Sequence, residues 1–562
     1  MQGRCQKETS KTHGARSPWP RRAFRARSAL AVNSSAFRLA LVILASVMLP
    51  GCGRAPDRAE LVLINGAEPE LFDPPLITAQ ATSRIAYALF EGLTSFDSKG
   101  VPQPGVAERW EISPDGLRYI FHLRKDARWS NGDPVTAEDF LYSWRRTLLP
   151  ATASEYSYQL HYIRGAKAFG EGKTTDFSTV GVRAPAMHTV EITLENPTPF
   201  FLDLCAFATL LPVHRATVEK HSDWASKPAH FTGNGAFLLR EWRPFDRVRL
   251  AKNPRYWNAA AVALNSVDVI PAPRPHTAFN FYATGLADLM MDKGLAPTPL
   301  LGELKKRPDF HAAPFLGNYF LRFNVTRKPF DDPRVRRAFC LVVDKASLVE
   351  RITRAGERPA TSFVPPGTGA GYEPPPSPER NVAEARRLLA EAGFPEGRDF
   401  PVRYYLYRAD SDLDRDIAVE LQSILRRDLG VSIQLAQQEN TVYLNSQSKL
   451  DYDISRSTWV GDYNDPNTFL DMFVADGGNN RTGWKNQRYD ELIAAAGREV
   501  DGKKRYGFFR EAERILITED PPICPLYYYV GIQFYDPEKL GGIEPNLLDE
   551  HPIKAIYRKK PR

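Results

Sequence analysis

Apolar and polar residues follow two different spacings along the chain, and each spacing predicts one kind of element. Strands are expected where apolar residues alternate with polar ones or form a short run bounded by turn residues. These segments are 61–64, 119–123, 189–194, 319–325, 402–407, 431–435, 452–455 and 524–534. Apolar residues three or four apart predict helices over 82–93, 278–289, 383–392, 417–428 and 506–517.

Two local signals add further elements. The apolar segments 236–239 and 248–250 flank a charged turn, which predicts a β-hairpin. Thr136-Ala-Glu-Asp139 resembles a capping box with Asp in place of Glu, so a helix is expected to follow, with Phe140 and Trp144 on one face.

The order of the predicted elements indicates an α/β fold. Between residues 383 and 435 helices and strands alternate, a pattern that favours a parallel sheet. A chain of 562 residues is too long for one ordinary hydrophobic core, so two or three domains are expected.

The N-terminus predicts an export signal over residues 1–51. A basic region ends at Arg38, and an apolar run over 39–49 follows that is too short to cross a membrane. The run ends in Leu49-Pro-Gly-Cys52, which resembles the bacterial lipobox, so Cys52 is expected to carry a lipid and to begin the mature chain. The alternative is a plain signal peptide with a chance cysteine. No later apolar run is long enough to span a bilayer.

The charge of the chain is concentrated in this leader. The whole sequence has a net charge of +7, and residues 1–51 hold nine Lys or Arg and one Glu. The rest therefore carries 7 − 8 = −1, which gives no reason to expect nucleic acid as a partner. Cys205, Cys340 and Cys524 are widely spaced and odd in number, so no disulfide framework, metal site or cofactor is expected. Each is predicted to be a small buried hydrophobe.

Candidate binding chemistry follows the predicted strand 452–455. A loop there is expected to hold one cation, Arg456, one large aromatic, Trp459, and one acid, Asp462. A peptide has matching groups, and its ammonium would need an anion in a closed cleft because an unpaired buried charge is expensive. In the alternative interpretation, Asp462 only begins a turn and Trp459 belongs to the core. Asp465-Pro466 resembles an N-cap followed by Pro at the first helical position.

The form R-x-x-W-x-x-D-Y-N-x-P over 456–466 resembles bacterial extracellular solute-binding proteins, family 5, of the oligopeptide and dipeptide class. Similar segments occur at 90–110, 121–144, 232–242 and 332–339, so the resemblance extends from about residue 61 to about 557. It implies an α/β fold of the periplasmic-binding-protein type II kind with three lobes. The lobes would be 52–90 with 215–316 and 530–562, then 91–214, and then 317–529, with a hinge in the crossing segments. Ligand is expected between the first and third lobes.

The resemblance also implies roles for individual residues. Asp462 would bind the peptide ammonium, and Trp459 would face a ligand side chain. Arg456 would meet a carboxylate or backbone carbonyl, although an Arg at a strand end is often a structural ion-pair partner. The backbone around Thr458 would pair with an extended peptide, and Tyr156 would approach the ligand main chain.

Some positions depart from the family pattern. Thr78 stands where an acid is expected near the ammonium site, Gln447 where a basic residue is expected, and Asp414 where a His is expected. The resemblance also places Gly317 and Val460 where the family has cysteines able to form a cross-link. Because of these departures, the resemblance does not fix the preferred length of the peptide or how its ammonium and carboxylate ends are bound.

The leading interpretation is a monomeric, lipid-anchored receptor in the periplasm or cell envelope that delivers peptides to an ABC-type permease. Alternatives on the same fold are a murein-peptide receptor and a signalling receptor without transport. A secreted hydrolase is disfavoured because no HExxH, GxSxG or paired-cysteine metal motif is present. A structural envelope lipoprotein would bind no ligand. The protein is therefore expected not to be an enzyme.

Overall fold

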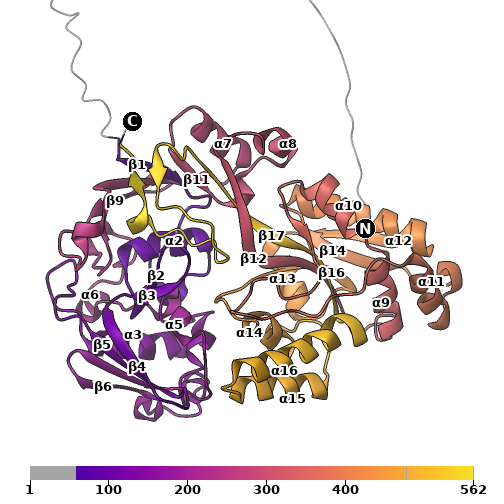
Figure 1. Ribbon diagram of the computed structural model, residues 1–562, viewed down its shortest axis with the longest axis horizontal. Helices are drawn as coiled ribbons and strands as arrows, with labels where there is room; N and C mark the ends of the chain where they lie inside the picture. The colour runs from indigo at the N-terminus through magenta and orange to yellow at the C-terminus, as the bar shows by residue number, and fades with distance from the viewer. Residues whose placement is uncertain (1–57, 476, 561–562) are drawn as a thin grey trace, which may run out of the picture. The chain divides into compact units, whose positions relative to one another are not determined.

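The computed structural model describes residues 58–475 and 477–560, apart from the side chain of Lys293 (Figure 1). The predicted export signal over 1–51 and the predicted lipidation site Cys52 lie outside the described residues. Among the residues described, no helix is both long enough and apolar enough to cross a membrane.

The largest sheet runs in the order β15-β14-β16-β12-β17-β11-β1-β10-β9-β8, with β13 pairing on β17. Its strands are β1 (Leu61–Ile64), β8 (Phe237–Arg243), β9 (Arg247–Lys252), β10 (Ser266–Ile270), β11 (Leu289–Met291), β12 (Phe310–Phe323), β13 (Arg358–Pro359), β14 (Arg403–Arg408), β15 (Ile433–Gln438), β16 (Ile454–Val460) and β17 (Ile523–Tyr535). β14 pairs in parallel with β15 and β16, as the alternating pattern predicts. β12 and β17 run antiparallel to their neighbours, so the sheet is mixed.

A second, four-stranded sheet has the order β4-β5-β7-β6. Its strands are β4 (Ala107–Ile112), β5 (Arg118–Leu123), β6 (Val182–Ala186) and β7 (Thr189–Thr193). Two small antiparallel pairs are β2 (Thr94–Phe96) with β3 (Pro102–Pro104), and β18 (Leu540–Gly541) with β19 (Tyr557–Arg558). The predicted capping box opens helix α3: the backbone N–H of Thr136 donates to the carboxylate of Asp139 at 2.7 Å.

The remaining α-helices are α2 (Gln80–Leu89), α4 (Ala166–Gly170), α5 (Phe201–Leu204), α6 (Arg215–Lys220), α7 (Pro275–Ala283), α8 (Leu301–Leu304), α9 (Pro333–Val342), α10 (Lys345–Leu348), α11 (Val382–Glu391), α12 (Asp412–Leu429), α13 (Asn440–Ser448), α14 (Asn467–Leu470), α15 (Gln487–Arg498) and α16 (Gly502–Arg514), while α3 is Ala137–Leu148. The predicted helix 278–289 is too long. Gly285 has a φ of +76°, which ends the helical path, and Leu289 begins a strand that pairs with β17.

The alternation of residues along β12 places helices on both faces of the large sheet (Figure 1). Tyr319, Leu321 and Phe323 pack against α9, α11 and α12, whereas Phe320 packs against α14, α15 and α16. This is the two-residue period of a strand buried on both sides. α/β character is therefore confirmed.

β12 and β17 connect the two ends of the large sheet. β12 pairs with β16 through residues 317–323, and β17 pairs with β11 through residues 533–535. The register between the two long strands shifts between Pro314 and Asn318, opposite Val530 and Tyr528. This break in regular pairing coincides with the predicted lobe boundaries at 316/317 and 529/530.

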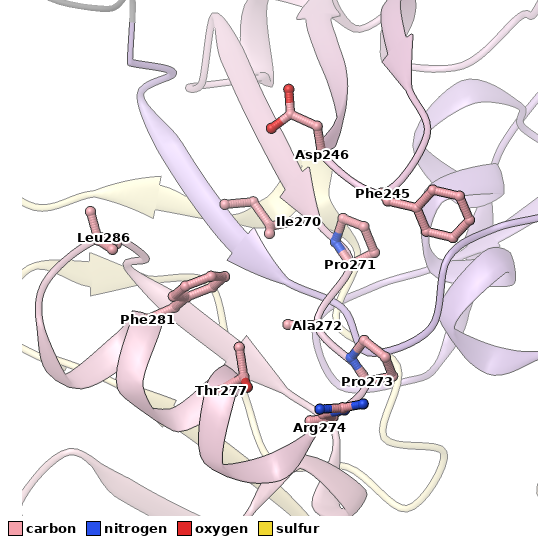
Figure 2. A pocket seen from close by; sticks show the side chains of 10 residues that line it. All are labelled: Phe245, Asp246, Ile270, Pro271, Ala272, Pro273, Arg274, Thr277, Phe281 and Leu286. Atoms are coloured by element: carbon pink, nitrogen blue, oxygen red, sulfur yellow. The ribbon is translucent and has the colours of Figure 1, made fainter. Parts of the chain in front are cut away.

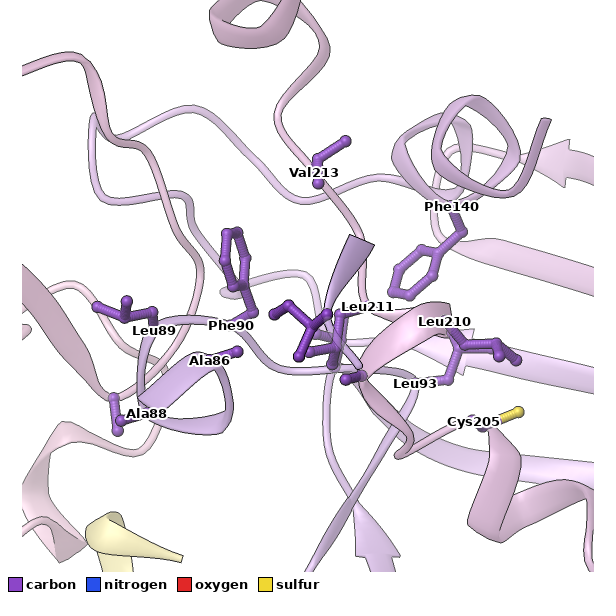
Figure 3. Close-up of a cluster of buried hydrophobic side chains, with 14 of the residues drawn as sticks. Ala86, Ala88, Leu89, Phe90, Leu93, Phe140, Cys205, Leu210, Leu211 and Val213 are labelled. Carbon is purple, nitrogen blue, oxygen red and sulfur yellow. The ribbon is translucent and has the colours of Figure 1, made fainter. Parts of the chain in front are cut away.

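Two of the three described cysteines, Cys205 and Cys524, are buried as predicted, whereas Cys340 is only partly buried. Cys205 lies among Leu93, Phe140 and Leu210 in a buried cluster (Figure 3). Cys524 is buried, Cys340 is partly buried, and these three are free thiols.

Candidate functional site

A cavity of about 440 Å³ brings four of the predicted binding residues together. Its lining comes from residues near 155–158, from β12, α13 and β16, and from the turn near 480: Glu155, Tyr156, Tyr158, Arg322, Tyr443, Leu444, Gln447, Arg456, Ser457, Thr458, Trp459, Asn479 and Arg481. These residues belong to the ranges 91–214 and 317–529. None of the lining comes from the described parts of the range expected to form the first lobe, so the cavity does not lie where the ligand was expected.

The strand prediction for this region was too short. β16 continues to Val460 and pairs with β12 from Ile454 opposite Phe323 to Val460 opposite Gly317. Arg456 and Trp459 therefore lie in a strand, and the expected loop begins only after Val460. Gly317 and Val460, the positions that correspond to cysteines in the family, are direct cross-strand partners.

The far edge of β16 is open beyond its second residue. β14 pairs with β16 only at Ile454 and Ser455, and the carbonyl oxygen of Arg456 accepts hydrogen bonds from Tyr443 Oη at 2.6 Å and Gln447 Nε2 at 2.9 Å. Backbone groups two residues apart point to the same edge of a strand, so the N–H and C=O of Thr458 also face this edge. In the described structure no strand pairs with it there. An open strand edge beside a cavity can accept an extended peptide.

Asp462 lies just past the end of β16 and is bound by neutral donors. Its Oδ2 accepts hydrogen bonds from Tyr158 Oη at 3.1 Å and from Gln159 Nε2 at 2.8 Å. Burial raises the pKa of Asp462 to about 7, and the two hydrogen bonds oppose this shift. No described Lys, Arg or His forms an ion pair with this carboxylate, which leaves it able to bind a cation.

Tyr156 and Trp459 supply flat apolar surface. The Tyr156 ring stacks on Tyr158 at 5.6 Å between centroids and also contacts Phe207. Burial, and then the charge of Asp462, raise the pKa of Tyr156, so its hydroxyl remains protonated. Trp459 is half-buried against the cluster on the α14–α16 side, and its indole N–H has no acceptor among the described residues.

Arg456 is already paired within the protein. Its Nε lies 2.9 Å from Asp414 Oδ2, both side chains are buried, and its guanidinium lies over the rings of Tyr319 and Tyr443 at 5.4 and 5.7 Å. Asp414 also contacts Arg408 at 3.3 Å. This geometry is that of a structural ion pair.

The other departures from the family pattern have separate surroundings. Gln447 is buried and donates to Tyr443 Oη, Ser455 Oγ and the carbonyl of Arg456, so it ties α13 to β16. Thr78 is exposed and does not line the cavity.

Several residues of the site were not anticipated from the sequence, among them Tyr158, Arg322 and Arg481 in the cavity lining and the buried Gln159, which bonds Asp462. The only available signal was Arg322, a cation inside the apolar strand segment 319–325. Tyr158 and Gln159 reach Asp462 across about 300 residues of sequence, which no local pattern reveals.

A second cavity, of about 460 Å³, lies between the β8–β9 turn and α7 (Figure 2). Its lining includes Phe245, Ile270, Pro273 and Phe281, with Asp246 and Arg274 as its charged residues. None of the predicted binding residues lines it, so the first cavity remains the candidate site.

Known proteins are similar to nearly the whole chain. The family described as "Bacterial extracellular solute-binding proteins, family 5 Middle" matches residues 101–481. The periplasmic oligopeptide-binding protein OppA of Salmonella typhimurium is 36% identical over 520 residues, which cover 91% of this chain and 94% of OppA. The probable deoxycholate-binding periplasmic protein YgiS of Escherichia coli is 35% identical and covers 88% of this chain and 92% of its own length.

Similarity extends to solved structures. The murein tripeptide binding protein MppA of Escherichia coli superposes with a TM-score of 0.79 at 33% identity, covering 90% of this chain and 99% of MppA. The relatives are substrate-binding proteins rather than enzymes. With the match over residues 101–481 and these full-length similarities, the chain belongs to the bacterial extracellular solute-binding proteins, family 5.

Proposed function

We propose that this protein is an extracytoplasmic receptor that binds oligopeptides and delivers them to an ABC-type permease. The observation that carries the proposal is the open edge of β16 at Thr458, which lies beside Tyr156 and Trp459 in the cavity, with Asp462 two residues past the end of the strand. Main-chain pairing along the edge supplies affinity that is independent of sequence. Asp462 supplies the anion that a peptide ammonium needs in an enclosed site.

Closure between lobes is part of this proposal. The discontinuous lobes would be 52–90 with 215–316 and 530–562, then 91–214, and then 317–529. The hinge would lie where β12 and β17 lose regular pairing, and closing would bring Tyr158 and Gln159 to Asp462.

The anchor and location belong to the same proposal. The sequence Leu49-Pro-Gly-Cys52 supports lipidation at Cys52, and the OppA and MppA relatives are described as periplasmic. The protein would act as a monomer held in the cell envelope by this lipid, without a nucleic-acid partner.

Two other ligands are favoured by specific similarities. MppA binds a murein tripeptide, and YgiS is described as a probable deoxycholate-binding protein. A murein receptor would keep the Asp462 contact with a free amino group. A deoxycholate receptor would use the aromatic walls without the strand edge.

Native mass spectrometry of gently purified protein tests the proposal. We expect co-purified masses that form a ladder of peptides of several lengths. A single murein-peptide mass would assign the narrower role. Saturable binding of deoxycholate in calorimetry, with no binding of a mixed peptide library, would contradict the proposal.

A further inference from the structure

Arg322 is a buried cation without a protein anion. It is 3% exposed, its Nε donates to Ser457 Oγ at 2.9 Å, and its Nη1 donates to the carbonyls of Asn479 and Asn480 at 2.8 and 2.7 Å. In the described part of the chain, no group accepts from Nη2 and no carboxylate lies within ion-pair distance. Burial first, and the nearby charge of Arg481 in addition, lower the pKa of Arg322 to about 10, so it remains charged at neutral pH.

Arg481 lines the same cavity and is also unpaired. Its buried Nε has no hydrogen-bond partner, and its guanidinium forms no ion pair with any residue that the structure describes. Its backbone has a φ of +38°, a conformation that costs a non-glycine residue free energy, and its carbonyl is held by the hydroxyl of Tyr452. The surrounding structure therefore holds Arg481 beside Arg322 despite strain and like charge.

The charges that line the cavity do not balance. Asp414 neutralises Arg456, and Glu155, which is the acidic residue of the lining, forms no ion pair with either of the other arginines. Two guanidinium groups therefore face one cavity without an anion. Guanidinium groups bind carboxylates with paired hydrogen bonds, and a buried charge is stabilised by such a partner.

We propose that Arg322 and Arg481 form an anion subsite that binds a carboxylate of the ligand. The proposal rests on the proposed peptide binding and narrows it to peptides with an acidic side chain, or a terminal carboxylate, at a fixed distance from the ammonium. Arg456 is not the carboxylate receptor, because its charge is already satisfied.

The chain limits that distance. Arg322 is bonded to Ser457, which lies five residues before Asp462. Five residues span at most about 18 Å. A peptide that is extended along β16, with its ammonium at Asp462, would reach the arginines with about its fourth or fifth residue.

Calorimetry with a hexapeptide series tests the subsite. The parent peptide is uncharged in its side chains, and single Asp residues replace Asn at each position. Each peptide is made with a free and with an amidated C-terminus, and a pentapeptide and a tetrapeptide are included. We expect a preference of about tenfold or more for Asp at one position, or for the free over the amidated end at one length. The first result identifies a side-chain carboxylate and the second a terminal one.

Matched variants connect the preference to the two arginines. Arg481→Gln should reduce the preference, measured as the ratio of the affinities for the acidic peptide and for the uncharged, amidated peptide, to less than about threefold. Arg322→Lys keeps the positive charge but loses the planar fork, and it should reduce the preference in part. Arg240→Gln removes an exposed arginine outside the cavity and should preserve it.

The outcomes separate this inference from the proposed function. Binding of every peptide with equal affinity by the wild type would overturn the subsite while peptide binding stands. A preference that survives in Arg481→Gln and in Arg322→Lys would also overturn it. If no peptide binds at all, peptide binding and the subsite that depends on it both fail.

Discussion

Two buried arginines on neighbouring strands, Arg456 on β16 and Arg322 on β12, carry their charge in opposite ways. Arg456 is paired with Asp414 on α12, on the face of the sheet that it shares with Tyr319 and Leu321. Arg322 lies on the other face with Phe320 and has no acidic partner. The two-residue period of a strand thus places two nearby arginines in different surroundings. The charge of Arg456 is neutralised by Asp414, whereas the charge of Arg322 is available to an anion of the ligand.

The same contrast applies to the two ends of the open edge. Asp462 accepts from two neutral donors and pairs with no cation, whereas Arg322 has only neutral partners, Arg481 Nε has none, and neither arginine pairs with an anion among the described residues. A peptide carries an ammonium and a carboxylate, so it would satisfy both ends at once. The unpaired charges therefore predict the direction of the bound peptide, with its ammonium at Asp462 and its carboxylate at Arg322 and Arg481.

The largest expected effect would test whether Arg456 is structural. Arg456→Gln leaves Asp414 buried beside only Arg408, and breaking a buried pair typically costs about 3–5 kcal/mol. We expect the free energy of unfolding in urea to fall by this amount. Arg481→Gln should change it by less than about 0.5 kcal/mol, because that side chain has no partner to lose. If Arg456→Gln and Arg481→Gln have the same free energy of unfolding, Arg456 is not the structural ion-pair partner that we infer.

The next effect concerns the acidic end. Asp462→Asn keeps the shape and removes the charge, so binding of a free-amino peptide should weaken by roughly thirtyfold or more, equivalent to about 2 kcal/mol. An N-acetylated peptide should lose a similar amount on the wild type. The two losses should not add, because both break the same pair.

Calorimetry on the four combinations of protein and peptide measures this coupling. Asp126→Asn, at an exposed site outside the cavity, serves as the control. If the losses of binding free energy from Asp462→Asn and from N-acetylation add, the peptide ammonium does not bind at Asp462.

A smaller effect follows from pH. The pKa of Asp462 is raised to about 7, so the protonated form is favoured in the ligand-free protein and the carboxylate appears as pH rises through 7. The raised pKa therefore adds to the free energy of unfolding of the ligand-free protein at low pH, and this stabilisation is lost as the pH rises through 7. Binding an ammonium requires the carboxylate, and the peptide ammonium stays protonated in this range. Affinity should fall about tenfold from pH 7 to pH 5.5.

Calorimetry in buffers with different ionisation enthalpies measures the proton released on binding at pH 6. Asp471 lies near Asp462 and also has a pKa raised to about 7, mainly by burial, while Tyr156, Tyr158 and Tyr162 remain protonated. Asp462→Asn should therefore lose most of the pH dependence. If it keeps all of it, Asp471 is the titrating group.

Local sequence patterns account for much of the fold. The capping box at Thr136, the β8–β9 hairpin and the alternating elements from α11 to β15 depend on neighbours close in sequence, and each is present. The end of α7 was missed because Leu286 and Leu289 continue the helical spacing, although Leu289 belongs to a strand that pairs with the distant β17. Tertiary pairing overrides spacing there.

The site was predictable only where a motif fixed it. Arg456, Thr458 and Trp459 were found through one segment, and the structure places them on one strand beside Tyr156. The pairing of Arg456 with Asp414 could not be read from the sequence, because it depends on α12 packing on the far face of the sheet. The unpaired state of Arg322 and Arg481 likewise depends on which acids the fold brings near.

The smallest expected effect concerns the hydrogen bond that Tyr158 donates to Asp462. Tyr158→Phe keeps the ring that stacks on Tyr156 and removes one of the two hydrogen bonds to Asp462. The carboxylate form loses a donor, so the pKa of Asp462 should rise further and fewer molecules should be ready for an ammonium at pH 7. We expect binding about threefold weaker at pH 7, which is within the roughly 0.5–1.5 kcal/mol of one hydrogen bond. The deficit should shrink by pH 8, where the carboxylate is ionised in both proteins. Tyr404→Phe, at an exposed strand position, provides the matched control. A deficit that is the same at pH 7 and pH 8 would mean that Tyr158 contacts the peptide directly rather than acting through Asp462.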